Sequence, residues 1–423
     1  MHIEGSDASS WLRDAAAQAR AASLVLAGMQ GPARDAGLRA IAQALHAASA
    51  AIVAANTRDL AAFDAAGGSP AFRDRLLLTP SRVAAMAEGV AQVADLPDPL
   101  ARTLAEWQRP NGLRIRRIAA PIGVIGMIYE SRPNVGADAA AICLKSGNAV
   151  ILRGGSDSLH SARAIQAAVA AGLRQSCLPE AAVQIAPAAD RAYVAAMLGG
   201  AGLLDLIIPR GGAGLVRRVQ AEARVPVLAH AEGLCHTYIH AAAAPEMARS
   251  VLHNAKLRRT GICSATETLL IDAAIAPALL PVLVAELAAA GCGFRADARA
   301  RAILPALPAA SAADFSTEWL DAVLNIAVVD GVDSALAHIR QHGSEHTEAI
   351  ITEDAAAADA FLRGSTSAVT LWNASTQFCD GGEFGFGAEI GIATGRVQAR
   401  GPVGPEQLTC FRYLVTGTGQ VRS

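Results

Sequence analysis

Two stretches of similar form decide the fold: Asn148-Ala149-Val150-Ile151-Leu152-Arg153-Gly154-Gly155-Ser156 and Leu206-Ile207-Ile208-Pro209-Arg210-Gly211-Gly212-Ala213. Each begins as a short apolar run, ends in Arg-Gly-Gly, and is followed by a segment with helical spacing of its apolar residues. A buried strand, a glycine turn and a helix form the repeating unit of a parallel sheet that is covered by helices. The two stretches therefore predict an α/β fold.

Working outward, further apolar strands are predicted on both sides. One strand covers residues 122–129 and another residues 182–185, while residues 8–102 have the alanine-rich and leucine-rich periodicity of amphipathic helices. After Val225 the alternation begins again, which indicates a second α/β domain with a parallel-rich sheet. Its strands are predicted at residues 237–239, 267–271, 326–329 and 349–351.

Two other segments have strand character but no obvious partner in sequence. Residues 113–118 alternate apolar side chains with arginine, and residues 408–415 are rich in β-forming residues. An unpaired strand needs a partner, so these segments pair either with each other or with another subunit. Both alternatives remain open from the sequence.

Length and composition exclude several classes of protein. The 423 residues suffice for two or three domains, and 52% hydrophobic against 17% charged residues exclude disorder. The 36 basic and 38 acidic residues nearly cancel, which argues against a nucleic-acid binder. No apolar run reaches the roughly 20 residues of a membrane span, and the N-terminus lacks a secretory signal, so we expect a cytoplasmic protein. Seven scattered cysteines without CxxC spacing argue against a disulfide framework and against a metal site.

The two Arg-Gly-Gly loops are candidate ligand sites. They comprise Arg153, Gly154, Gly155 and Ser156 in the first loop, and Pro209, Arg210, Gly211 and Gly212 in the second. Helix amino termini attract phosphate and glycine lets it approach the backbone, which indicates a dinucleotide cofactor. A glycine at such a turn equally often serves only the conformation of the turn and binds no ligand. The GxGxxG fingerprint of an ordinary Rossmann domain is absent.

Cys263 is the candidate nucleophile. It lies in a short polar loop before a predicted strand, near Lys256, Arg258 and Arg259, and these cations predict a lowered thiol pKa. The alternative for any cysteine is a small buried hydrophobic residue, which we adopt for Cys143.

Asn134 follows the strand at residues 122–129, in Ser131-Arg132-Pro133-Asn134. At a strand end its amide can donate to a reacting carbonyl oxygen, or it can cap the next helix. We interpret His236, which follows Cys235 on a predicted strand, as structural.

Several long motifs occur in an order that resembles one family, the gamma-glutamyl phosphate reductases of proline biosynthesis, also called glutamate-5-semialdehyde dehydrogenases. They span nearly the whole chain and lie at residues 123–135, 144–155, 206–215, around Cys263, and at residues 343–353 and 399–404.

The resemblance implies the aldehyde dehydrogenase fold, with two α/β domains and a β arm for oligomerisation. It implies a cofactor-binding domain at residues 1–112 and 128–232, a catalytic domain at 233–372, and an arm at 113–127 and 400–423. Residues 373–399 form a return segment that we assign to neither domain.

The resemblance also implies NADPH-dependent reduction of L-glutamate 5-phosphate to L-glutamate 5-semialdehyde, with release of phosphate and a thioacyl intermediate on Cys263. Asn134 is then the donor to the oxyanion, the two Arg-Gly-Gly loops face the cofactor, and Glu318 contacts the nicotinamide ribose. A homo-oligomer and functional coupling to glutamate 5-kinase are further implications.

The chain departs from related patterns at two places. Many family members carry lysine where this chain has Ser156, so a cationic contact to an adenosine phosphate has to come from another residue. Hydrolytic aldehyde dehydrogenases use a Glu-Leu-Gly-Gly-Lys segment to activate water, where this chain has His230-Ala231-Glu232-Gly233-Leu234. The alternatives to a reductase are a hydrolytic aldehyde dehydrogenase and an inactive binding module of the same fold.

Overall fold

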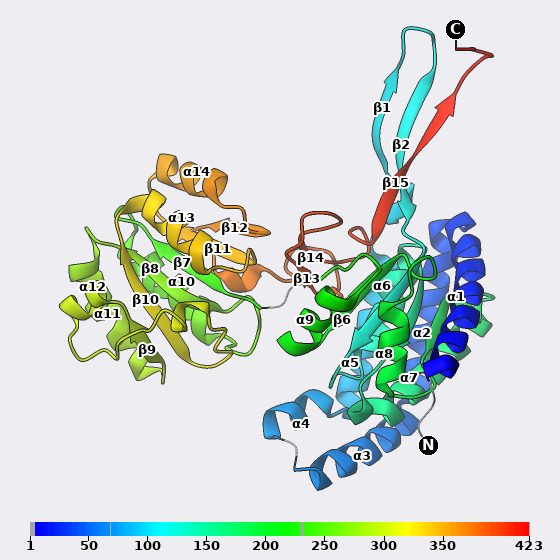
Figure 1. Cartoon of the computed structure of the whole chain (residues 1–423), viewed down its shortest axis with the longest axis horizontal. Helices are drawn as coiled ribbons and strands as arrows, with labels where there is room; N and C mark the ends of the chain where they lie inside the picture. The colour runs from blue at the N-terminus through cyan, green and yellow to red at the C-terminus, as the bar shows by residue number, and fades with distance from the viewer. Residues whose placement is uncertain (1–4, 68, 230–231, 423) are drawn as a thin grey trace.

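The computed structural model describes residues 5–67, 69–229 and 232–422. Two α/β domains lie side by side, and a narrow β arm projects from one of them (Figure 1). Five short 3₁₀ turns connect the larger elements: η1 (Pro99–Ala101), η2 (Ser156–Ser158), η3 (Glu180–Ala182), η4 (Asp314–Ser316) and η5 (Thr376–Phe378).

The first domain contains a four-stranded parallel sheet in the order β5-β4-β3-β6. Alternate strand residues point to opposite faces, so Ile125 and Met127 pack under one helical layer and Val124 and Ile128 under the other. The strands are β3 (Val124–Tyr129), β4 (Ala149–Arg153), β5 (Val183–Ile185) and β6 (Leu206–Arg210). The helices are α1 (Gly5–Gly28), α2 (Gly31–Ala47), α3 (Ser49–Ala65), α4 (Pro70–Leu76), α5 (Pro80–Asp95), α6 (Val135–Lys145), α7 (Leu159–Gln175), α8 (Arg191–Leu198) and α9 (Ala213–Glu222).

The second domain has a six-stranded parallel sheet in the order β12-β11-β7-β8-β10-β9. Its strands are β7 (Cys235–Ile239), β8 (Thr266–Asp272), β9 (Gly293–Ala296), β10 (Val323–Val329), β11 (Thr347–Ile351) and β12 (Val369–Trp372). One face is covered by α10 (Pro245–Leu257), α11 (Ala276–Ala289) and α12 (Ala298–Ile303), the other by α13 (Gly331–His342) and α14 (Ala355–Gly364). The predicted α/β architecture with two parallel-rich sheets is confirmed.

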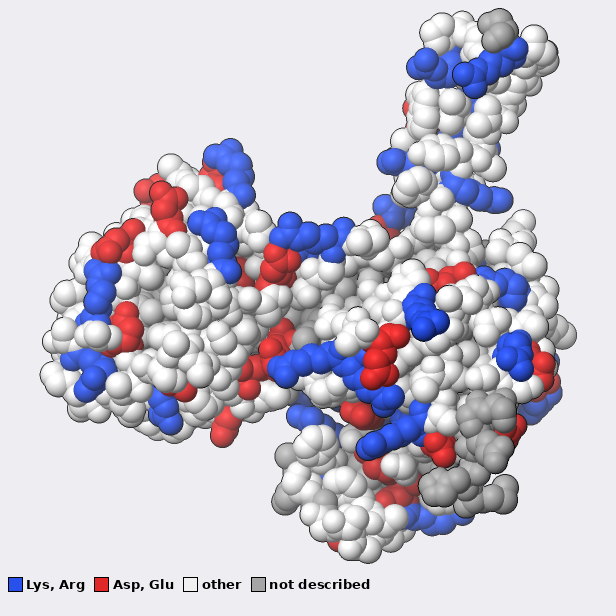
Figure 2. Space-filling model, viewed as in Figure 1, with Lys and Arg blue, Asp and Glu red and all other residues white. Residues whose placement is uncertain are grey.

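The arm is an antiparallel sheet of three strands in the order β1-β2-β15. These are β1 (Thr103–Gln108), β2 (Arg114–Pro121) and β15 (Thr409–Thr416). β15 pairs with β2 of the same chain, which selects the first of the two alternatives that the sequence left open. Most of its side chains are exposed, and Figure 2 shows basic residues gathered towards its free end.

The limits of the arm differ from the expected ones in three places. Residues 103–108 form β1 in the arm because the turn at residues 109–112, with Gly112 at φ +87°, closes a hairpin onto β2. Residues 124–127 belong to β3, at the centre of the parallel sheet. Residues 401–408 leave the arm because their apolar side chains, Val403 and Leu408, are buried in the core of the first domain. There β14 (Gly401–Pro402) pairs with β13 (Ile392–Ala393).

The only two lysines of the chain are enclosed within the protein. The Lys145 ammonium donates to Asp35 at 2.6 Å and to the Ala94 carbonyl at 2.9 Å, and its side chain is 1% exposed. The Lys256 ammonium donates to Glu267 at 2.7 Å, and its side chain is 0% exposed. Every basic side chain on the described surface other than histidine is therefore an arginine.

A search of the described residues finds no single helix with the length and hydropathy of a membrane span. Only α2 and α3 together pass that test, and they meet at an angle of 65°. In the same part of the chain, no group of three or more His, Cys, Asp and Glu side chains has the arrangement of a metal site.

Candidate active site

Three loops meet at the carboxyl edge of the first sheet, because β3, β4 and β6 are neighbouring parallel strands. Ile128 pairs with Arg153 and Tyr129 with Arg210, and the Glu130 amide donates to the Arg210 carbonyl at 3.0 Å. The register therefore aligns the loop at residues 130–134 with both Arg-Gly-Gly loops. β3 is also the strand from which the chain order runs in opposite directions, which is where ligands bind in open α/β sheets.

Both Arg-Gly-Gly loops have the features of a phosphate cradle. Gly155 and Gly212 occupy the residue positions just before η2 and α9, and neither helix start has a side-chain cap, so their first amides are left for a ligand. A Cβ atom at Gly211 would lie 2.5 Å from the Glu130 carboxylate, and one at Gly154 would lie 3.1 Å from the Tyr129 ring. The predicted contact of these loops with a dinucleotide stays a prediction.

Arg153 is not an exposed cation of this cradle. Its residue is 7% exposed and its guanidinium donates to the Ala189 carbonyl at 2.7 Å. Burial lowers the pKa of Arg153, and the carboxylates of Glu130, Asp157 and Asp190 oppose that shift. Its neighbour Ser156 is exposed.

Cys263 lies in the loop between α10 and β8, at the amino edge of the second sheet. The Cys235 thiol donates to the Cys263 carbonyl at 3.1 Å, and a Cβ atom at Gly233 would lie only 2.0 Å from the same oxygen. The Cys263 side chain packs against a small apolar cluster that includes Cys379 and Ile392. The loop is therefore held from one side by the start of β7 and from the other by the return segment.

The sequence prediction of a lowered Cys263 pKa is wrong for this state of the protein. Burial raises the pKa of the thiol to about 12, and Arg210 is the main cation that opposes this shift. Lys256 is paired with Glu267 in the interior, and the Arg258 guanidinium donates to Gln377 at 3.1 Å. Two of the three cations that precede Cys263 in the sequence are thus held by other partners.

Asn134 precedes the first residue of α6, but its side chain does not cap the helix. Its Nδ2 instead donates to the Asp138 carboxylate at 2.9 Å. Burial raises the pKa of Asp138 to about 6, while the Asn134 amide and Arg210 act to lower it. The helix-cap alternative for Asn134 is therefore not realised.

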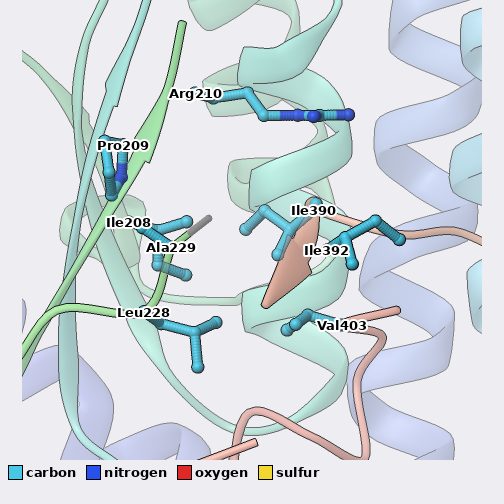
Figure 3. A pocket seen from close by; sticks show the side chains of 9 residues that line it. Ile208, Pro209, Arg210, Leu228, Ala229, Ile390, Ile392 and Val403 are labelled. Atoms are coloured by element: carbon cyan, nitrogen blue, oxygen red, sulfur yellow. The ribbon is translucent and has the colours of Figure 1, made fainter. Parts of the chain in front are cut away.

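Arg210 joins the two halves of the site. Its charge acts on the titration of both Cys263 and Asp138, and its guanidinium lies 4.0 Å from the Glu389 carboxylate. The side chain extends over Ile390 and Ile392 above a small apolar void of about 10 Å³, enough for about one water (Figure 3). Arg210 thus acts electrostatically on Cys263 of the second domain and on Asp138 of the first.

Glu318 lies beside the nucleophile loop. Its carboxylate accepts from the Gly233 amide at 2.9 Å, and its charge contributes to the raised pKa of Cys263. Burial raises the pKa of Glu318 itself. The predicted contact between Glu318 and a nicotinamide ribose stays a prediction.

Sequence reasoning missed several residues of this site. Arg132 stands inside a quoted motif, two residues before Asn134, but received no role. Glu389 and Gln377 come from the return segment, whose glycine-rich sequence has no helical or strand period. The spacing of Asn134 and Asp138, four residues apart at a helix start, is the signal that could have revealed their contact.

No family model matches the chain. A gamma-glutamyl phosphate reductase from Acidiphilium cryptum is 70% identical over 411 residues, which cover 97% of each chain. The chain belongs to the gamma-glutamyl phosphate reductases. A second reductase of this name, from Gluconobacter oxydans, is 69% identical over 99% of this chain and 97% of its own length.

Solved structures of related proteins show which fold the chain has. The gamma-glutamyl phosphate reductase of Thermotoga maritima is 40% identical, covers 97% of this chain and 100% of its own, and superimposes with a TM-score of 0.95. An acetylating aldehyde dehydrogenase from Geobacillus thermoglucosidasius, 18% identical with full coverage of both chains, has a TM-score of 0.68. This reductase therefore has the aldehyde dehydrogenase fold, and the predicted family is confirmed.

Proposed function

We propose that this reductase converts L-glutamate 5-phosphate to L-glutamate 5-semialdehyde with NADPH, in the second step of proline biosynthesis. Close relatives over almost the whole chain support the reaction. The hydrogen bond from Asn134 to Asp138, with the Arg210 charge acting on both Asp138 and Cys263, is the observation that supports a thioacyl route.

In this route the Cys263 sulfur bonds to the acyl carbon and the bond from that carbon to the phosphate oxygen breaks. Inorganic phosphate leaves and a thioester remains on the chain. The loops at residues 153–156 and 209–212 would hold NADPH, which when bound would supply the hydride that reduces the thioester. The Cys263 sulfur then leaves the carbon and the semialdehyde is released.

Asn134 stabilises the oxygen that becomes negative during these steps. The Asp138 carboxylate accepts one N–H of the Asn134 amide and thereby fixes which end of the amide donates. The second N–H is left for the substrate oxygen. Such preorganised donors are among the largest single contributions to acyl transfer.

Cys263 has to lose its proton before it can attack. With a pKa of about 12 the thiol is protonated at neutral pH in the free enzyme. Arg210 is the charge that stabilises the thiolate once substrate has arrived.

A hydrolytic aldehyde dehydrogenase needs a carboxylate that activates water. The nearest sequence counterpart, Glu232, is engaged in an ion pair with Arg217 of α9. His230 and Ala231 of the same segment lie outside the described residues. The ion pair favours the phosphate-linked reductase.

We also propose a homo-oligomer assembled through the arm. Both edge strands of that sheet lack a partner within the described chain, and it exposes Trp107, Phe411, Tyr413 and Val415. Open strand edges with exposed aromatic residues are suited to pairing with another copy.

The proposed setting is the cytoplasm, with functional coupling to glutamate 5-kinase. All seven cysteines are free, as expected in a reducing compartment. An acyl phosphate is labile in water, so direct use of the kinase product would limit its loss.

The test is oxidation of glutamate 5-semialdehyde by NADP⁺ with and without phosphate. We expect a strict requirement for phosphate and no turnover by the Cys263→Ala variant, which should still bind cofactor. Turnover without phosphate would indicate the hydrolytic alternative, and no nicotinamide turnover would indicate an inactive binding module.

Alkylation of the free enzyme gives a second test of Cys263. Since Cys177 and Cys410 are exposed, they should react with iodoacetamide before Cys263 does. The alkylation rate of Cys263, followed by mass spectrometry, should rise with pH up to at least 10 because burial raises the pKa of its thiol to about 12. A rate that levels off below pH 8 would contradict the raised pKa.

A further inference from the structure

Arg132 is a partly buried cation without a partner in the part of the chain that the structure describes. No hydrogen bond or ion pair of its side chain is found there. The charged side chains that act on it most strongly, Arg210, Arg75 and Arg259, are all positive. Burial, together with the repulsion from these cations, lowers the pKa of Arg132 to about 10.

Two more deeply enclosed arginines of this protein have hydrogen-bond partners for part of their guanidinium groups. Arg34 donates to Asp98 at 2.6 Å and to two backbone carbonyls, and Arg153 donates to the Ala189 carbonyl. Arg210 has only the Glu389 carboxylate, at 4.0 Å. A cluster of like charges with one distant counter-charge is costly unless a ligand supplies negative charge.

The loop that carries Arg132 is held in a strained conformation. Ser131 has φ +49°, a left-handed conformation that is uncommon for residues other than glycine, and its hydroxyl donates to the Asp157 carboxylate. Backbone strain of this kind is found where a functional side chain has to be aimed. Asn134 follows Arg132 by two residues in the same loop.

The cluster also lies close to the nucleophile. The Arg210 side chain passes Gly391, where an added Cβ atom would lie 3.8 Å from the guanidinium carbon, and the next residue, Ile392, packs in one cluster with Cys263. Arg259 comes from the Cys263 loop of the other domain, four residues before the cysteine. An anion held by Arg132 and Arg259 would therefore lie next to the reacting sulfur.

We propose that Arg132 and Arg259, with Arg210 beside them, form the subsite that binds the phosphate group of the acyl phosphate. This inference rests on the proposed function. A phosphate dianion matches the fork of guanidinium N–H donors and offsets the repulsion within the cluster. In the reverse direction the same subsite holds free phosphate while one of its oxygens bonds to the thioester carbon and the bond to Cys263 Sγ breaks.

Reverse-direction kinetics test the subsite because phosphate and semialdehyde are then separate substrates. In Arg132→Gln we expect the KM for phosphate to rise by about 10- to 100-fold, the effect of losing a charged hydrogen bond. The KM values for semialdehyde and for NADP⁺ should stay within about twofold. Arg132→Lys should recover part of the phosphate affinity, and Arg340→Gln, on the exposed face of α13, should have no effect.

The same experiment distinguishes the alternatives. A selective rise in the KM for semialdehyde would overturn the proposal in favour of a site for the substrate carboxylate. A selective rise in the KM for NADP⁺ would overturn the proposal in favour of a site for a phosphate group of the cofactor. An unchanged KM for phosphate with a strict phosphate requirement would refute this subsite alone, whereas turnover without phosphate would refute the proposed function.

Binding without turnover gives a second measurement. Inorganic phosphate should raise the melting temperature of the inactive Cys263→Ala variant in a concentration-dependent manner. The double variant with Arg132→Gln should need about 10- to 100-fold more phosphate for the same shift. Equal shifts in the two variants would contradict the proposal.

Discussion

Asn134 stands at a helix start where an asparagine commonly caps, yet its amide bonds to the side chain of Asp138. Its removal should therefore affect chemistry more than folding. For Asn134→Ala we expect a decrease in kcat of about 10²–10³-fold. Thermal unfolding should change little because no cap is lost. A large decrease in the melting temperature with normal kcat would instead indicate a structural role.

The Asp138 carboxyl makes the stability of the protein depend on pH in a defined direction. Its pKa is about 6 in the folded protein, against roughly 3.9 in an unfolded chain, so the folded state holds this proton more tightly. Ionisation of Asp138 therefore destabilises the fold as pH rises from about 4 to above 6, by at most roughly 3 kcal/mol.

The matched variant is Asp138→Asn, whose side-chain oxygen can still accept from Asn134. We expect its free energy of unfolding, relative to wild type, to increase between pH 4 and pH 7 by roughly 2–3 kcal/mol. Urea unfolding of both proteins at several pH values measures this difference. A difference that does not vary with pH would show that Asp138 titrates normally.

Individual site residues were predicted from sequence to different extents. Asn134 could be singled out because it ends a clear strand, and Cys263 because it stands in a polar loop before one. The pKa of Cys263 could not be predicted, since the burial of the thiol comes from the fold, Lys256 and Arg258 are paired elsewhere, and Arg210 approaches from the other domain. Contacts between domains leave no local pattern in the amino-acid sequence.

At the scale of elements, the start of β7 fixes the position of the nucleophile loop. A side chain at Gly233 would clash with the backbone of Cys263, which cannot move aside as the end of a flexible side chain could. Gly233→Ala should displace the loop, decrease kcat at least tenfold and reduce stability by about 1–3 kcal/mol. Cofactor affinity, measured by fluorescence titration, should remain nearly normal.

A suitable control for Gly233 lies in α5. Nothing lies within 4 Å of a Cβ atom added at Gly89, so Gly89→Ala should keep full activity and gain roughly 0.5–1 kcal/mol from helix propensity. If both alanine variants behaved alike, close packing at Gly233 would not be the cause.

Most strands of the two parallel sheets could be predicted because buried parallel strands are continuous apolar runs. The arm was harder. β1 carries exposed polar and apolar residues without a core, so its strand character depends on pairing with β2. Residues 373–399 have little regular structure of their own and are ordered by contacts with both domains, including Glu389 with Arg210.

In the whole molecule, the C-terminal segment from Leu408 onward belongs to two different structures, the first domain and the arm. Leu408 is buried in the first domain and its carbonyl accepts from Asn148 at 2.8 Å, whereas β15 from Thr409 onward belongs to the arm. A truncation that tests assembly should therefore begin at Thr409. We expect both domains to fold and the oligomer to dissociate or aggregate, as measured by sedimentation and circular dichroism.

Full retention of the oligomer and of activity in that truncated protein would place the interface elsewhere. A Leu408→Ala variant separates the two effects, since it should lose about 2–5 kcal/mol of stability from the core without removing β15. Its oligomeric state should be unchanged as long as it is folded.

Enclosure of Lys145 and Lys256 has a chemical consequence for an enzyme of this family. Aldehydes condense with free amines to imines, and acyl phosphates acylate them, whereas a guanidinium remains protonated and does not react in this way. With both ammonium groups inside ion pairs, the folded chain offers such electrophiles no lysine amine. An amine-reactive ester should accordingly leave both lysines unmodified in the native protein and label both in urea, so self-inactivation by lysine adducts is avoided by the fold itself.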